Sequence, residues 1–136
     1  MNTDMKFILV DDDDFNNKLH DIVIKRIVGK GAAIEIFTEP EKGLEFIQKN
    51  YTESSDHTIV FLDVDMPRIN GWDFLVLYEE FSDEVKMQIS IYILSISLDQ
   101  YDRNKAISNK NVRGFISKPL TTGVILSIAG NEFENC

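Results

Sequence analysis

The chain has 136 residues, of which 43% are hydrophobic and 27% are charged, proportions typical of one folded domain and not of a disordered chain. There are 14 basic and 23 acidic residues, and the resulting net charge of -9 argues against binding to nucleic acid or to an anionic membrane. No apolar run is long enough to span a membrane, and the single cysteine cannot form an intrachain disulfide, so we expect a cytoplasmic protein.

Short apolar segments alternate with segments of helical periodicity along the whole chain. Strands are expected at residues 6–10, 32–37, 58–62, 89–94 and 112–117. Helices are expected after an N-cap at Asp14, after a capping box formed by Thr38 and Glu41, after Gly71, over residues 99–108 and after an N-cap at Thr121. Continuous apolar strands joined by helical crossovers predict a doubly wound α/β domain whose parallel sheet is covered on both faces.

The carboxyl ends of the expected strands carry the chemically active side chains. The first strand ends in four aspartates that begin at Asp11, the third ends at Asp63, the fourth near Ser95 and the fifth near Lys118. Ligands of open parallel sheets bind beyond these strand ends, so the four positions should share one site. Carboxylates suit Mg²⁺ or can attack phosphorus, and a lysine and a hydroxyl can hold phosphoryl oxygens. Each residue alone would more often be a cap, turn or surface residue, and only their joint occurrence indicates a site.

Four segments together resemble the receiver domain of bacterial two-component response regulators. They are Val10-Asp11-Asp12, Leu62-Asp63-Val64-Asp65-Met66-Pro67 with Gly71, Leu94-Ser95, and Gly114-Phe115-Ile116-Ser117-Lys118-Pro119. The resemblance covers about residues 6–129 and implies a flavodoxin-like, CheY-like (βα)₅ fold with the strand order 2-1-3-4-5. We expect one receiver domain over residues 1–136 and no output domain.

The resemblance implies that Asp63 accepts a phosphoryl group from a histidine kinase or a histidine phosphotransfer protein. It also implies that Asp12 and Asp63 bind Mg²⁺ or Mn²⁺ directly, together with the backbone carbonyl of Asp65, and that Asp11 acts mainly through water. The protein would then be a signalling phosphoacceptor that catalyses its own phosphotransfer and dephosphorylation, rather than an enzyme with a separate substrate. The acidic side chain of Asp65 is an addition whose effect on hydrolysis has no predicted sign.

By the same resemblance, Ser95 and Lys118 contact the phosphoryl oxygens, and Ser95 and Phe115 are the switch positions. The chain departs from the family pattern at Ile96, where a small residue is usual and where a bulky side chain would crowd the mouth of the site. Phe115 lacks the phenolic hydroxyl that a tyrosine would offer. The resemblance further implies a cis peptide bond between Lys118 and Pro119.

The expected output is contact with another protein. The switch positions flank the fourth expected helix (99–108), the fifth strand and the fifth helix, and we expect the partner surface there. Tyr101, Phe115 and Leu120 are the expected participants.

Three other functions fit parts of the pattern. A relay would pass the phosphoryl group on to a second histidine protein, and a degenerate receiver would act only as a scaffold. The segment Leu62-Asp63-Val64-Asp65 also resembles the DxD motif of haloacid-dehalogenase-like phosphatases, but that family carries the motif on its first strand, whereas two strands precede Asp63 here. His20 could be a phosphohistidine, although a solvated helix histidine is the simpler interpretation.

Overall fold

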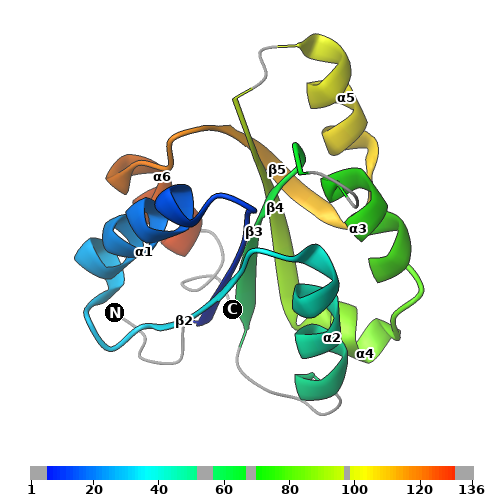
Figure 1. Ribbon diagram of the computed structural model, residues 1–136, viewed down its shortest axis with the longest axis horizontal. Helices are drawn as coiled ribbons and strands as arrows, with labels where there is room; N and C mark the ends of the chain where they lie inside the picture. Colours follow the sequence, from blue (N-terminus) through cyan, green and yellow to red (C-terminus); the bar gives the residue numbers. More distant parts are fainter. Residues whose placement is uncertain (1–5, 52–56, 67–69, 97–98, 131–136) are drawn as a thin grey trace.

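A computed structural model describes residues 6–51, 57–66, 70–96 and 99–130. Its centre is a five-stranded parallel sheet with the order β2-β1-β3-β4-β5, as the resemblance implies (Figure 1). The strands are β1 (Lys6–Val10), β2 (Ala33–Phe37), β3 (Thr58–Asp63), β4 (Ile89–Ser95) and β5 (Val112–Ser117). The helices are α1 (Asp14–Val28), α2 (Pro40–Asn50), α3 (Gly71–Tyr78), α4 (Asp83–Met87), α5 (Gln100–Ser108) and α6 (Thr122–Ala129).

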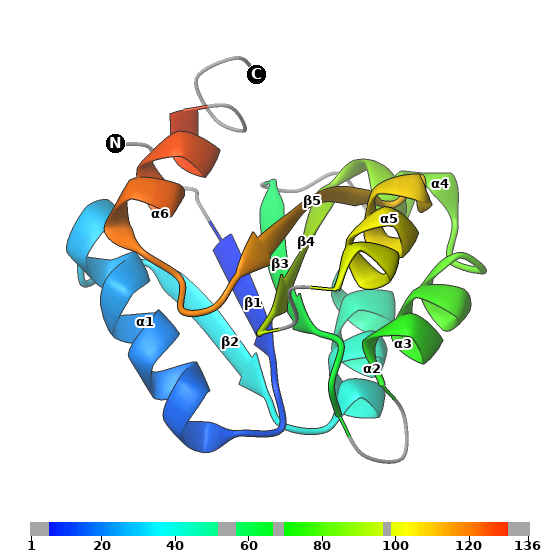
Figure 2. The same ribbon diagram turned by 90° about the horizontal axis from the view of Figure 1, so that it is seen from above.

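Helices cover both faces of the sheet, so the doubly wound α/β architecture predicted from the sequence is confirmed. Figure 2 shows α1 and α6 on one face and α2, α3 and α5 on the other. The central strand β3 is buried at all six of its positions, and separate apolar clusters fill the space on its two sides. Burial on both faces explains why the strand sequences are continuously apolar.

Two of the expected helix starts are wrong in detail. Asp13, not Asp14, caps α1: its side chain accepts hydrogen bonds from the backbone N–H groups of Phe15 and Asn16, because the extended backbone of Asp13 leaves the carboxylate facing the first turn. The capping box of Thr38 and Glu41 does not form. The N-cap of α2 is Glu39, which makes no side-chain cap, and Pro40 fixes the first helical residue instead.

The sequence also missed one helix. The spacing of apolar residues predicts a third helix through Phe81, and the acidic run Glu79-Glu80 with Asp83-Glu84 is typical of a solvated helix end. The structure ends α3 at Tyr78 and starts the separate α4 at Ser82, whose hydroxyl accepts a hydrogen bond from the backbone N–H of Val85 at 3.3 Å. The expected cap at Thr121 is confirmed, and the helix expected over 99–108 is α5, with Asp99 as its N-cap. The polar composition of residues 50–57 predicts a loop, most of which lies outside the described residues.

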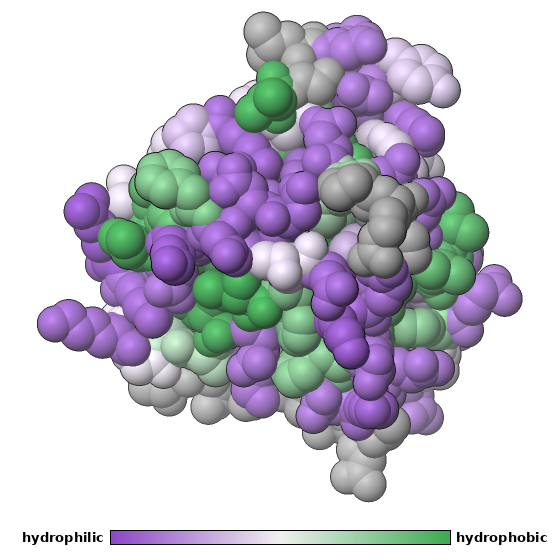
Figure 3. Space-filling view, viewed as in Figure 1, coloured by the Kyte–Doolittle hydropathy of each residue, from purple (hydrophilic) through white to green (hydrophobic). Residues whose placement is uncertain are grey.

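The molecular surface is mostly hydrophilic on the face shown in Figure 3, where apolar side chains form separate small patches. His20 is an exception to the expectation of a solvated helix histidine. Only 1% of its surface is exposed, because it lies on the inward side of α1. Among the described residues, no helix combines the length and the apolar character needed to cross a lipid bilayer.

Candidate functional site

Three aspartates meet at the carboxyl edge of the sheet. β1 and β3 are neighbours in parallel register, with Val10 opposite Leu62, so the residues that follow them emerge side by side. Asp11, Asp12 and Asp63 each offer a carboxylate oxygen, and these oxygens lie within 4.8 Å of one another. Asp11 and Asp63 are buried, whereas Asp12 is exposed. Two of the three carboxylates are therefore shielded from solvent, and the third faces it.

Lys118 reaches this acidic cluster from β5, at the far side of the sheet. Its Nζ lies 2.8 Å from Oδ2 of Asp11 and 3.4 Å from Oδ1 of Asp63, so one ammonium group bridges the two buried carboxylates. Its backbone N–H donates to the carbonyl of Ser95 at 2.9 Å, which ties the end of β4 to the same place. The peptide bond between Lys118 and Pro119 is cis, as predicted.

The buried charges change the acidity of the groups that carry them. Burial, and then the neighbouring charge of Asp11, raise the pKa of Asp63 from 3.8 to about 6, although Lys118 and the backbone N–H of Asp65 act in the opposite direction. Burial alone would lower the pKa of Lys118. Its hydrogen bond to Asp11 and the charge of Asp63 outweigh burial, so the net shift is upward and the amine stays charged. The site therefore holds an electrostatically costly excess of negative charge.

The chain between β3 and α3 is shaped around Asp63. The backbone N–H of Asp65 donates to Oδ1 of Asp63 at 3.2 Å, and the N–H of Gly71 donates to the carbonyl of Val64 at 3.3 Å. A Cβ atom at Gly71 would lie 2.6 Å from the Cα of Val64 and 2.7 Å from the carbonyl oxygen of Asp63, closer than real Cβ atoms come. Only glycine therefore allows α3 to begin so near the acidic cluster.

Asn17 is a positioning residue that the sequence analysis missed. It is 1% exposed on α1, and its Nδ2 donates to the backbone carbonyl of Asp11 at 2.8 Å. This bond fixes the turn at which the aspartates leave β1. The buried positions of α1 are Asn17, His20 and Ile24, at helical spacing, and this spacing was the available signal, because a buried amide needs a specific partner.

The predicted switch residues lie along the neighbouring strands. Ser95 is fully buried at the end of β4, in register with Ser117 of β5. Phe115 is half-buried on β5, and the guanidinium carbon of Arg103 on α5 lies 5.8 Å from its ring centroid. Ile96 is 75% exposed.

Because α4 is a helix that the sequence did not predict, the fourth and fifth expected helices are α5 and α6. The expected partner surface is therefore formed by α5, β5 and α6. Tyr101 is exposed on it, but Leu120 is 2% exposed and packs into the core, so its assignment to the surface was wrong.

The donor atoms of the acidic cluster fit a hard divalent cation. Asp11, Asp12 and Asp63 supply carboxylate oxygens only, and such oxygens are the ligands that Mg²⁺ takes, usually one or two of them with water and phosphate oxygens. A bound cation would also offset the negative charge that raises the pKa of Asp63. The structure brings together the three carboxylates expected to hold the ion, and the role of the Asp65 backbone carbonyl stays a prediction.

A doubly wound sheet with an acidic cluster and a lysine at its carboxyl edge defines the class of receiver-like domains, and comparisons identify the family. The model of the response regulator receiver domain family matches residues 7–129, and the chain belongs to this family. It is 25% identical to the two-component response regulator ARR22 of Arabidopsis thaliana over 93% of this chain and 82% of that protein.

Solved structures give the same result. A two-component response regulator from Cytophaga hutchinsonii has a TM-score of 0.83 and 26% identity, covering 96% of this chain and 97% of that one. A receiver protein from Dyadobacter fermentans DSM 18053 has the same fold, with a TM-score of 0.83, 21% identity and coverage of 93% and 96%. Receiver domains are phosphoacceptors with autophosphatase activity, bind Mg²⁺ at an acidic pocket, and interact with histidine kinases or phosphotransfer proteins.

Proposed function

We propose that this protein accepts a phosphoryl group on Asp63 from a histidine kinase or a histidine phosphotransfer protein and thereby changes its affinity for a downstream protein. The observation that carries the proposal is the position of one lysine amine between two buried carboxylates. Lys118 lies within 3.4 Å of Asp63, and Asp11 and Asp12 complete an oxygen-rich cluster beside it.

In the proposed reaction, an oxygen of the Asp63 carboxylate attacks the phosphorus of a phosphohistidine. A P–O bond forms while the P–N bond breaks, and the donor imidazole leaves with the electron pair of that bond. Lys118 and Ser95 would hold the phosphoryl oxygens, because an ammonium group and a hydroxyl can both donate to them. Asp11, Asp12 and Asp63, with the backbone carbonyl of Asp65, would hold Mg²⁺ or Mn²⁺, which supplies charge neutralisation for the transferred group. Hydrolysis of the aspartyl phosphate would return the carboxylate.

Phosphate uptake tests this assignment. Purified protein is incubated with a phosphorylated donor and Mg²⁺, and the bound phosphoryl group is counted by mass spectrometry. We expect one acid-labile phosphoryl group on the wild type and none on Asp63→Asn, whereas Asp65→Asn, which changes a neighbouring exposed carboxylate, keeps the modification. Labelling of the Asp63→Asn variant at another residue would overturn the assignment, and unlabelled wild-type protein would favour the scaffold.

We propose that the output leaves through the face formed by α5, β5 and α6. Support comes from Phe115, which is half-buried on β5 under Arg103 of α5, and from Tyr101, which is 69% exposed on the same helix. A change at Ser95 would reach this face along β4 and β5, which are paired in register. The receiver would thus signal by protein contact and not by binding nucleic acid or a membrane.

A partner titration tests the output. Proteins captured by the phosphorylated form are titrated against phosphorylated and unphosphorylated protein, and a coupling of about 5–150-fold in affinity is expected. Equal affinities in both states, combined with transfer of the phosphoryl group from Asp63 to a histidine protein, would establish the relay and contradict the contact mechanism.

A further inference from the structure

A second polar cavity lies at the opposite edge of the sheet from Asp63. It has a volume of about 200 Å³ and lies near the amino ends of β4 and β5, beside α3 and α4. The polar residues that line it are His57, Tyr78, Lys86, Lys110, Asn111 and Arg113, and the described residues contribute no carboxylate to the lining. Because Asp63 lies at the carboxyl ends of the same parallel strands, this cavity is separate from the acidic site.

The charge of this cavity is opposite to that of the molecule as a whole. Lys86, Lys110 and Arg113 bring positive charge to one place in a chain whose net charge is -9. Lys86 is partly buried, with 15% of its side chain exposed, so solvent screens its charge less than that of a surface lysine. A concentration of cations in a concave, polar setting attracts small anions.

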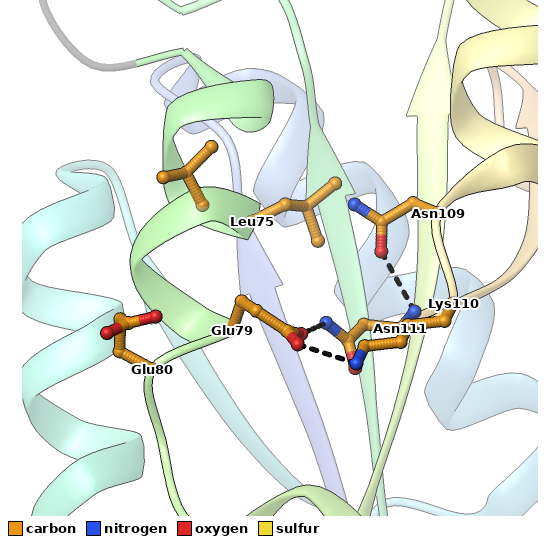
Figure 4. Close-up of a pocket in the computed structure, with 7 residues that line it drawn as sticks. Leu75, Glu79, Glu80, Asn109, Lys110 and Asn111 are labelled. Atoms are coloured by element: carbon orange, nitrogen blue, oxygen red, sulfur yellow. Dashed lines mark hydrogen bonds and ion pairs between the residues drawn. The ribbon is translucent and has the colours of Figure 1, made fainter.

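A nearby carboxylate accounts for only part of this donor capacity. Glu79 lies 2.8 Å from Nζ of Lys110 and 3.5 Å from Nζ of Lys86, and it accepts a hydrogen bond from Asn111. Figure 4 shows Lys110 and Asn111 beside Glu79, which lines a neighbouring cavity and not this one. Nζ of Lys86 also donates to the backbone carbonyl of Glu79 at 2.9 Å. Each ammonium carries three N–H donors, so each lysine retains at least one donor beyond its contacts with Glu79.

Tyr78 adds a hydroxyl donor to the lining of the cavity. Its side chain is 1% exposed and lines the cavity, and its ring packs between Phe74 and Phe81. Its hydroxyl forms no hydrogen bond with any residue in the part of the chain that the structure describes. Burial, and then the charge of Glu79, raise its pKa, so the hydroxyl stays protonated and can donate. The hydroxyl is therefore an available donor at the cavity, and an anion bound there would accept its hydrogen bond.

We propose that this cavity binds the phosphate group of a small anion, with the hydroxyl of Tyr78 and the side chains of Lys86 and Arg113 as its donors. The ligand is either free inorganic phosphate or a phosphate ester such as a nucleoside monophosphate. Binding would brace α3 and α4 against the start of β5, and it does not depend on phosphorylation of Asp63.

Binding is measured by NMR titration with inorganic phosphate or with AMP, in EDTA and at constant ionic strength. All titrations use the Asp63→Asn variant, so that the acidic site cannot act as a phosphoacceptor. We expect saturable chemical-shift changes of the backbone amides around His57, Lys86 and Arg113. Tighter binding of one of the two probes identifies the source of the phosphate group.

Two variants and a control decide the proposal. Tyr78→Phe removes only a hydroxyl without a partner and should preserve the fold while weakening phosphate binding about tenfold. Arg113→Gln should weaken it by a similar factor or more. Lys49→Gln removes an exposed lysine of α2 that pairs with Glu45 and should leave binding unchanged. Equal binding by Tyr78→Phe and the control, or shifts concentrated at Lys118, would overturn the proposal.

Discussion

Without a divalent cation, replacing Asp63 by asparagine should stabilise the fold. Asp63 is 4% exposed and its pKa rises from 3.8 to about 6 in the native state, mainly through burial and the charge of Asp11. Each pKa unit corresponds to about 1.4 kcal/mol, so ionising this carboxyl in the native state costs up to roughly 3 kcal/mol. Asparagine removes that cost but also removes one of the two carboxylates beside Lys118. We therefore expect a gain of about 1–3 kcal/mol in the free energy of unfolding.

The pH dependence follows from the direction of the shift. A raised native pKa favours the protonated native state, so the penalty is absent below the unfolded pKa of 3.8, develops as pH rises towards about 6, and is complete above that value. The advantage of Asp63→Asn over the wild type should therefore grow between pH 4 and about 6 and stay constant at higher pH.

Urea unfolding in EDTA at pH 4 and pH 8 measures this effect. Asp65→Asn, which changes an exposed carboxylate two residues away, is the matched control and should shift stability by less than about 0.5 kcal/mol. Added Mg²⁺ should stabilise the wild type more than Asp63→Asn, because the ion binds the native acidic cluster. A variant no more stable than the wild type at pH 8, or an equal gain at both pH values, would refute the electrostatic reasoning.

Four further changes test other parts of the structure. Gly71→Ala places a Cβ against the backbone of Asp63 and Val64, so it should cost about 1–3 kcal/mol in urea unfolding and slow phosphate uptake, and an unchanged rate would contradict the tight packing. Asn17→Ala removes the bond to the carbonyl of Asp11 and should cost about 1–2 kcal/mol and weaken Mg²⁺ binding in a calorimetric titration; unaltered Mg²⁺ affinity would rule out its positioning role. Phe115→Ala should reduce the ratio of partner affinities between the phosphorylated and unphosphorylated forms, and an intact ratio would exclude it as a switch residue. Mg²⁺ affinity should fall as pH drops below about 6, because protons compete for Asp63, and a flat profile between pH 5 and 8 would argue against Asp63 as a ligand.

The sequence predicted the strands and the site better than it predicted the helix ends. Buried parallel strands are uniformly apolar, so β3 and β4 could be located, and the residues after them had to share one edge. The start of α2 depends on a local competition between Pro40 and a capping box, and tertiary contacts decide such competitions. Nothing local in the chain predicted that Lys118 and Asp11, 107 positions apart, would lie at 2.8 Å. The strand-end rule for parallel sheets placed both residues in one site, but it could not predict a direct ion pair between them.

The position of Asp63 on the sheet determines which parts of the molecule can respond to it. This residue ends the central strand, whose six residues are all buried and which is held by a neighbour on each side, so the acceptor itself has little freedom to move. By contrast, β5 is an edge strand without a fully buried residue, and α5 is anchored in the core through Ala106 alone among its nine residues. We therefore expect a charge added at Asp63 to displace α5 and β5 more than β3. Amide hydrogen exchange should be slowest in β3 and should change most on phosphorylation in α5 and β5. The difference in local stability between these elements would then determine where the structural change reaches the surface.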